Sequence, residues 1–247
     1  MKVELFENET VDDLQINGLG VIQKDDVFKF GTDAVLLSDF AAKVHSDTTL
    51  DLCTGNAIVP ILMSAKTKTK EFCAIEIQEE IYSMAVRSVA MNGLSEKIRL
   101  YCENLVNAQN FFQKRSFDLV TCNPPYMKKN SAVVNDNLKK VIARHEIMCD
   151  LEDIINISSQ LMKTTGHLVM VYRPQRLCEL ICMMNKYNIA PKRIRFVHKN
   201  AKLEPSLVLV DGLFGGKSDV RIIPPLIMFD ENQCESEELK KIYGRNE

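Results

Sequence analysis

The chain of 247 residues has no apolar run that approaches the ~18 residues of a membrane-spanning helix. Its first ten residues, MKVELFENET, are acidic, so they lack the basic start of a secretory signal peptide. Internal repeats, low-complexity tracts and a convincing linker are missing as well. We therefore expect a cytoplasmic protein without membrane contacts, folded as a single domain.

Cysteine pairs of the CxxC type, at the spacing found in zinc fingers, are also absent from this chain of eight cysteines. Cys178 and Cys182, four residues apart on a predicted helix, have no convergent histidine or cysteine nearby. We expect no metal site, and we expect the thiols to be reduced. Four cysteines fall in or beside predicted strands, where a small apolar side chain packs well: Cys53, Cys73, Cys102 and Cys122.

The composition is that of an ordinary soluble globular protein, with 46% hydrophobic and 26% charged residues. We expect residues 1–247 to form one α/β domain. Within it, residues 1–32 are expected to form an N-terminal hairpin, residues 33–229 the catalytic core, and residues 230–247 an acidic tail that is helical or frayed.

The order of apolar patterns predicts a doubly wound sheet. Asn17-Gly18 lies between alternating strands and predicts a tight hairpin turn. Strand-like runs follow at Thr49–Cys53, Phe72–Glu76, Ile98–Cys102, Phe117–Cys122, Leu168–Tyr172, Arg193–His198 and Leu207–Leu213. Helix-like segments lie between most of them, at 57–66, 78–92, 104–113, 151–164 and 174–187.

The first four runs are continuously apolar, which is typical of a parallel sheet covered on both faces. The last strands have no helix between them and predict an antiparallel hairpin at the end of the sheet, to which Arg221–Phe229 adds a possible edge strand. The polar segment 127–150 predicts a long loop that grips a substrate.

A strand followed by Asn123-Pro124-Pro125-Tyr126 indicates methylation of a planar nitrogen. Such a nitrogen must pyramidalise before it attacks, and acceptors beside its N–H groups favour that change. Asn123 offers a side-chain carbonyl and Pro124 a backbone carbonyl, whose direction Pro125 restricts. Tyr126 offers a flat face for stacking, which is worth about 1–3 kcal/mol per base.

The segment Asp51-Leu52-Cys53-Thr54-Gly55-Asn56-Ala57 predicts a cofactor-binding turn after the first strand of the sheet. Gly55 allows close approach of a ligand, and the following helix directs N–H groups at it. Glu76 ends the next strand, 21 positions after Gly55, where a carboxylate bridges two ribose hydroxyls. The further glycines that a pyrophosphate needs are missing, which favours S-adenosylmethionine over NAD.

The charge distribution suggests a polyanionic partner for the second half of the chain. Residues 1–119 hold 12 basic and 18 acidic residues, a net charge of −6, whereas residues 120–223 hold 16 and 9, a net charge of +7. This favours a nucleic acid substrate. The candidate phosphate contacts near the motif are Lys128, Lys129, Lys139, Lys140 and Arg144, and those that extend the track are Lys192, Arg193, Arg195, Lys199 and Lys202.

Together, these motifs resemble the class I S-adenosylmethionine-dependent methyltransferases that modify planar amino nitrogens. Further matches lie at residues 28–37, 51–60, 144–146, 172–177 and 224–227. These segments resemble the bacterial tRNA1(Val) (adenine-37-N6)-methyltransferase family, and the similarity runs from about residue 11 to 229.

The resemblance implies a Rossmann-like, mostly parallel sheet of seven strands with the last strand antiparallel. It also implies a tRNA substrate methylated at N6 of adenine 37. Thr32 and Gly55 would approach the methionine part of the cofactor, Glu76 would take the ribose hydroxyls, and Asn123 and Tyr126 would hold the base.

The chain departs from the family at two positions near the cofactor. Ala57 stands where the family usually has glycine. Alanine is tolerated there only if its φ is negative, so we expect a negative φ at this position. Asn104 stands where the family usually presents an aspartate to the adenine amine, so we expect weaker cofactor binding through an amide oxygen.

Three alternatives remain open. Methyltransferases for guanine N2 or for protein glutamine share the reaction class, although the glutamine enzymes carry a helical domain where this chain has a short hairpin. A decayed enzyme retained as an RNA-binding module is the second alternative. An NAD-dependent oxidoreductase is the third, and it lacks the glycine pattern. The sequence gives no expectation of the oligomeric state.

Overall fold

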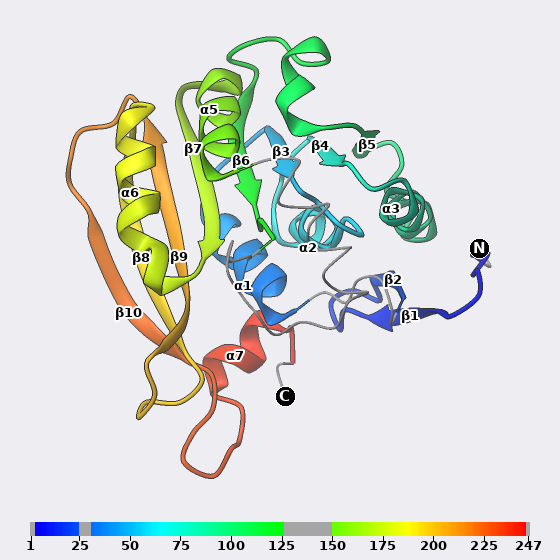
Figure 1. Cartoon of the computed structure of the whole chain (residues 1–247). Helices are drawn as coiled ribbons and strands as arrows, with labels where there is room; N and C mark the ends of the chain where they lie inside the picture. The colour runs from blue at the N-terminus through cyan, green and yellow to red at the C-terminus, as the bar shows by residue number, and fades with distance from the viewer. Residues whose placement is uncertain (1–2, 25–30, 126–149, 246–247) are drawn as a thin grey trace, which may run out of the picture.

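A computed structural model describes residues 3–24, 31–125 and 150–245 of the chain (Figure 1). Its centre is a sheet of eight strands in the order β10-β8-β9-β7-β6-β3-β4-β5. The strands are β3 (Thr48–Leu52), β4 (Glu71–Glu76), β5 (Ile98–Cys102), β6 (Phe117–Cys122), β7 (Met162–Tyr172), β8 (Ile189–His198), β9 (Pro205–Phe214) and β10 (Arg221–Ile227).

Strand β9 lies between β7 and β8 and is antiparallel to both, whereas all other neighbouring strands of this sheet are parallel. The predicted mostly parallel sheet with a terminal antiparallel hairpin is therefore confirmed. The sheet has eight strands instead of seven, because Arg221–Ile227 pairs with β8 as the edge strand.

Helices cover both faces of the sheet (Figure 1). On one face lie α1 (Thr32–Ala41), α2 (Ile58–Lys66), α3 (Glu79–Met91) and the short α7 (Glu237–Ile242) of the acidic tail. On the other face lie the 3-10 helix η1 (Leu105–Asn110), α5 (Leu151–Leu161) and α6 (Leu177–Lys186), which follows the single turn η2 (Pro174–Arg176).

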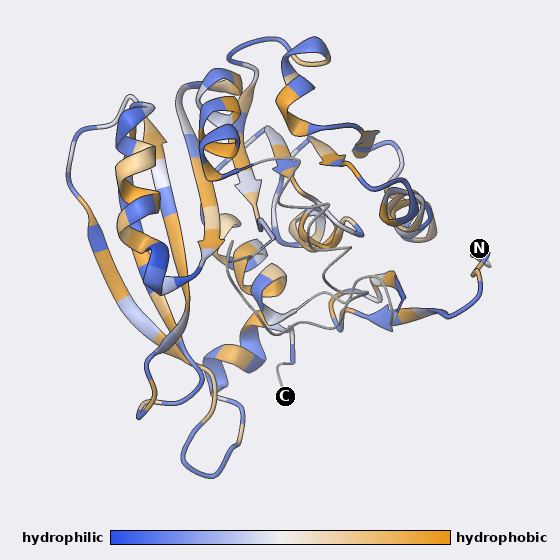
Figure 2. Cartoon of the chain, viewed as in Figure 1, coloured by the Kyte–Doolittle hydropathy of each residue, from blue (hydrophilic) through white to orange (hydrophobic). Residues whose placement is uncertain are grey.

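The two faces explain the continuous apolar runs. In β6, Leu119 packs in the core under α1 and α2, and its neighbours Val120 and Cys122 pack in the core under α5. A strand buried on both sides needs apolar residues at successive positions. Helix α6 shows hydrophilic residues alongside hydrophobic ones (Figure 2), since it buries Leu180 and Met184 against the sheet.

The predicted hairpin is formed by β1 (Glu9–Asp13) and β2 (Gly20–Lys24), which pair antiparallel. Asn17 and Gly18 have φ values of 52° and 69°. Both residues of a type I′ turn need this left-handed region, which Asn and Gly tolerate best. The hairpin packs on α3, and Arg87 holds the Glu9 carboxylate with Nη–Oε distances of 2.5 and 2.7 Å.

Several elements differ from the prediction in type or in their bounds; β8, for example, begins at Ile189 and not at Arg193. Segment 104–113 contains a 3-10 helix in place of an α-helix, and the Asn104 side chain caps its first turn by accepting from the Val106 N–H at 3.1 Å. Helix α5 ends at Leu161 and β7 begins directly at Met162, although the pattern predicted a helix to residue 164. The start of β7 is irregular: Thr165 has a left-handed φ of 66°, and the pairing of β6 with β7 shifts register between Phe117 and Leu119.

Within the described ranges, no helix combines the length and apolarity that a membrane crossing requires.

Candidate active site

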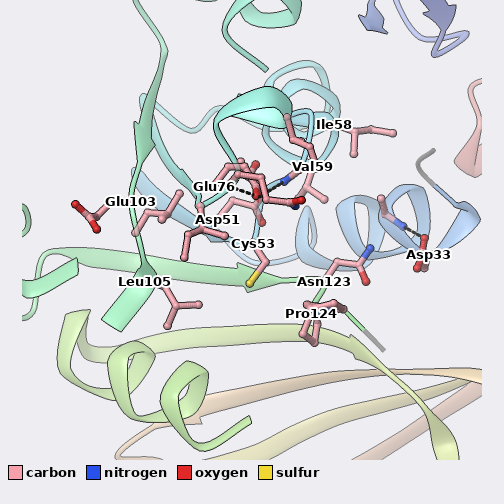
Figure 3. A pocket seen from close by; sticks show the side chains of 18 of the residues that line it. Asp33, Asp51, Cys53, Ile58, Val59, Glu76, Glu103, Leu105, Asn123 and Pro124 are labelled. Carbon is pink, nitrogen blue, oxygen red and sulfur yellow. Dashed lines mark hydrogen bonds between the residues drawn. The ribbon is translucent and has the colours of Figure 1, made fainter. Parts of the chain in front are cut away.

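A cavity opens at the carboxyl ends of β3, β4 and β6 (Figure 3). This edge of an open parallel sheet, next to the position where strand order reverses, is the usual ligand site of such folds. The lining residues are Gly31, Asp33, Ala34, Asp51, Cys53, Thr54, Gly55, Ile58, Val59, Ile75, Glu76, Ile77, Gln78, Ile81, Glu103, Asn104, Leu105, Asn123, Pro124 and Pro125.

The turn that follows β3 forms the floor of the cavity and has an unusual backbone. Cys53, Gly55 and Ala57 have φ values of 57°, 60° and 66°. The expectation of a negative φ at Ala57 is therefore wrong. A left-handed alanine costs roughly 1–2 kcal/mol, and burial of its methyl group returns about 0.8 kcal/mol. Ala57 is fully buried, so this compensation applies.

Glu76 reaches from the end of β4 to this turn. Its Oε2 accepts the Gly55 N–H at 2.9 Å, and its Oε1 accepts the Gln78 N–H at 2.9 Å. The carboxylate is 5% exposed and faces the cavity (Figure 3). Each carboxylate oxygen can accept more than one hydrogen bond, so the two backbone contacts fix the group and leave acceptor positions for a ligand.

Asp51, the fourth residue of β3, is the most perturbed acid of the cavity. Burial raises its pKa to about 7. The hydrogen bond that the Thr121 hydroxyl donates to Oδ1 at 2.6 Å has the opposite, smaller effect and lowers the pKa. The other carboxylate oxygen, Oδ2, has no partner at hydrogen-bond distance among the described residues, although the nearby Thr54 hydroxyl also acts to lower the pKa. A buried polar atom of this kind marks a position where a ligand's donor group fits.

Residues after β5 close the cavity on its far side. Glu103 accepts hydrogen bonds from the Asn107 side chain at 3.0 Å and from the Asn104 N–H at 2.8 Å, and these bonds lower its pKa. Asn104 lines the cavity as predicted, but its side-chain oxygen also caps η1. One lone pair of that oxygen is thus already engaged in a hydrogen bond.

Asn123, Pro124 and Pro125 follow β6 and line the same cavity as Glu76 and Gly55. Figure 3 shows Asn123 and Pro124 beside Cys53, at the end of the strand. Tyr126, the last residue of the predicted motif, lies outside the described residues.

Helix α1 contributes its amino-terminal end to the cavity wall. Gly31, Asp33 and Ala34 line the cavity, whereas Thr32, the predicted contact, is not among the lining residues. The Asp33 carboxylate accepts the Ala34 N–H at 2.9 Å, so it stabilises the first turn of the helix.

The structure separates the predicted RNA contacts into two groups. Arg193 Nε donates to the buried Asp211 at 2.7 Å, and Arg195 Nη2 donates to Glu238 at 2.7 Å. Lys192 is bonded to Lys217 O at 2.7 Å and to Asp219. These internal bonds argue against a phosphate-binding role for Arg193 and Arg195, whereas Lys199 is exposed. Lys128, Lys129, Lys139, Lys140 and Arg144 lie outside the described residues.

Most lining residues that the sequence did not single out are apolar, and four of them come from α2, α3 and η1. Ile58, Val59, Ile81 and Leu105 were read as ordinary helix positions, because apolar spacing does not distinguish a cavity wall from a core. Cys53 packs against the core as predicted, and it also lines the cavity. Its position two residues before Gly55 was the signal that pointed to the cavity.

The sheet order and the cavity at its carboxyl edge define an α/β protein of the doubly wound type with a ligand site beside β3. The model of the methyltransferase small domain matches residues 19–196, and the chain belongs to this family. The protein is therefore a methyltransferase, as its motifs predicted.

Two similar proteins narrow the resemblance. One is the tRNA1(Val) (adenine(37)-N6)-methyltransferase of Histophilus somni (strain 129Pt), 27% identical, with 74% of this chain and 82% of that protein covered. Another, of the same name, comes from Flavobacteriaceae bacterium (strain 3519-10), with 24% identity and coverages of 77% and 79%. The family resemblance predicted from the sequence is confirmed.

Solved structures share the fold. A predicted O-methyltransferase, Atu636 from Agrobacterium tumefaciens, has a TM-score of 0.70 at 21% identity, covering 86% of this chain and 96% of that one. Geranyl diphosphate C-methyltransferase from Streptomyces coelicolor, solved with S-adenosyl-L-homocysteine, has a TM-score of 0.53 at 12% identity and coverages of 73% and 79%.

Proposed function

We propose that this protein transfers the methyl group of S-adenosylmethionine to N6 of an adenine in tRNA, at position 37 of tRNA1(Val). One observation carries the proposal: Asn123 and Pro124 line the same cavity as Glu76 and the Gly55 turn. An acceptor pair for a planar amino group thus lies beside a nucleoside-binding arrangement. The names of the similar proteins supply the substrate.

The cavity residues fit the cofactor. Glu76 holds the ribose hydroxyls through the lone pairs that its two backbone contacts leave available. Asp51 Oδ2, which has no partner among the described residues, accepts a hydrogen bond from a donor group of the cofactor. Asn104 Oδ1 accepts from the adenine amine with its second lone pair, and Ile58, Val59 and Leu105 supply apolar contacts.

Asn123 and Pro124 prepare the nucleophile. Their carbonyl oxygens accept the two N–H groups of the adenine amino nitrogen, and this favours the pyramidal geometry in which its lone pair is available. The bound cofactor supplies an electrophilic methyl carbon on a sulfonium. The new N–C bond forms as the S–C bond breaks, and a neutral thioether leaves. The nitrogen then releases its proton to water, so no general base is required.

Adenine 37 lies in a single-stranded loop, so turning it into the cavity costs less than extrusion from a duplex. Tyr126 stacks on the base, and the exposed Lys199, with Lys128, Lys129, Lys139, Lys140 and Arg144, contacts the phosphate backbone. Such contacts make affinity depend on salt concentration.

The decisive experiment incubates the purified protein with labelled S-adenosylmethionine and unmodified bulk tRNA, and identifies the product by nucleoside mass spectrometry. We expect N6-methyladenosine in tRNA1(Val). Labelled N2-methylguanosine, or labelled protein beside unlabelled RNA, would show one of the alternative substrates. Cofactor binding without transfer to any acceptor would favour the decayed enzyme.

A further inference from the structure

The outer edge of strand β2 is bound by side chains instead of by another strand. Ser88 Oγ accepts the Ile22 N–H at 2.9 Å, and Asn56 Nδ2 donates to the Ile22 carbonyl at 3.1 Å. Two residues earlier in β2, Asn92 accepts from the Gly20 N–H at 3.0 Å and donates to the Gly20 carbonyl at 2.7 Å. Side chains thus hold the hairpin at Ile22 and at Gly20. One of these side chains, Asn56, belongs to the proposed cofactor turn after β3.

That turn needs external support. Cys53 and Ala57 hold left-handed backbone angles on either side of Gly55, and neither is a glycine. Such residues persist only where their surroundings fix them. From β4, Ile75 O accepts the Thr54 N–H at 3.0 Å and Glu76 accepts the Gly55 N–H at 2.9 Å.

Asn56 supports the turn from the opposite direction. Its side chain is fully buried, and its Oδ1 has no partner among the described residues, so the amide is held through Nδ2 and Ile22. The Ile22 side chain packs with Ile81 and Met84, and Ile81 lines the cavity. The hairpin therefore contacts the Gly55 turn through this hydrogen bond, and it contacts Ile81, a lining residue of the cavity, through its apolar side chain.

We propose that Asn56 is a positioning residue for the cofactor. It braces the strained turn against Ile22, and this makes the N-terminal hairpin a part of the cofactor site. The inference rests on the proposed function, because it assumes that the Gly55 turn carries S-adenosylmethionine.

Asn56→Ala tests the brace, and Asn92→Ala is its matched control. Each variant removes one amide that holds one residue of β2, but Asn56 belongs to the Gly55 turn, whereas Asn92 follows α3. Both are expected to lower the unfolding temperature. In calorimetric titrations with S-adenosylhomocysteine, only Asn56→Ala raises Kd, by about 10-fold, which corresponds to the loss of one buried hydrogen bond.

The kinetics separate positioning from general destabilisation. For Asn56→Ala, KM for S-adenosylmethionine rises with Kd, and kcat at saturating cofactor is retained. Equal Kd values for wild type, Asn56→Ala and Asn92→Ala would overturn the brace, and so would equal weakening by both substitutions.

If Asn56→Ala does not fold, Ser88→Ala removes the other bond to Ile22 with almost no change of shape. A several-fold increase in Kd supports the brace, and an unchanged Kd overturns it. Wild-type protein that does not bind S-adenosylhomocysteine contradicts the proposed function itself, which keeps the two failures distinct.

Discussion

Glu76 Oε2 accepts the Gly55 N–H at 2.9 Å, although the two residues are 21 positions apart in the chain. The contact joins the carboxyl ends of two adjacent parallel strands, β3 and β4. A single side chain therefore fixes the turn after β3 and also lines the cavity, where we propose that it binds the ribose of the cofactor.

Glu76→Gln is expected to raise the Kd for S-adenosylhomocysteine by about 10- to 100-fold. The amide has one carbonyl oxygen for two backbone N–H groups, and hydrogen bonds to a charged group are worth about 1.5–3 kcal/mol. Calorimetric titration measures the effect. Glu79→Gln is the control, because Glu79 lies outside the cavity lining in the first turn of α3. Equal Kd values of Glu76→Gln and Glu79→Gln for S-adenosylhomocysteine would contradict the assignment of Glu76 to the cofactor site.

Asn123→Ala is expected to lower kcat by ~100-fold or more, the order found when a preorganised transition-state hydrogen-bond partner is lost. The Kd for the cofactor should stay within a few-fold, because Asn123 is assigned to the base. Single-turnover transfer to tRNA measures the rate. Asn110→Ala, at the exposed end of η1, serves as the control. A rate for Asn123→Ala near that of wild type would contradict the assignment.

Asp51 makes stability depend on pH. Its pKa is raised from 3.8 to about 7, so between these values the folded chain keeps a proton that the unfolded chain has released. The stability that this proton contributes is complete below about pH 4 and is lost as pH rises through 7. Asp51→Asn lacks this dependence, and it should gain stability over wild type with rising pH, on the order of a few kcal/mol.

Urea unfolding without cofactor, at acidic and at mildly alkaline pH, measures this difference between wild type and Asp51→Asn. Asp219→Asn is the control, since its carboxylate is 77% exposed. Parallel pH profiles for wild type and Asp51→Asn would contradict the raised pKa.

Substitution of Arg193 should lower the stability of the fold, whereas substitution of Lys199 should weaken the binding of tRNA. Arg193→Met leaves the Asp211 carboxylate, 2% exposed, bonded to His167 Nδ1 but without its arginine partner, and should destabilise the fold by about 2 kcal/mol. Lys199→Met should leave stability unchanged and raise KM for tRNA most strongly at low salt. Urea unfolding and transfer assays at two salt concentrations measure both. Unchanged stability of Arg193→Met would contradict the structural role assigned to Arg193.

Local patterns were sufficient to predict the sheet. Strands β3 to β6 fall within about one residue of the predicted runs, because burial on both faces requires continuous apolar sequence. The turn at Asn17-Gly18 was also readable, since few residue pairs tolerate its backbone.

What escaped prediction depends on contacts between distant residues. Arg193 was predicted to contact RNA, because a sequence shows a basic residue without showing the buried Asp211 beside it. The left-handed Ala57 was missed for a related reason: the burial that offsets part of its strain comes from the folded core. The hairpin contacts through Asn56 and Asn92 span 34 and 72 positions and leave no periodic signal.

All described lining residues of the cavity fall between Gly31 and Pro125. Strands β8 to β10 come later and extend the sheet beyond β7, away from this region. Substitutions in β8 to β10 can therefore change the far end of the sheet without replacing any described lining residue of the cavity.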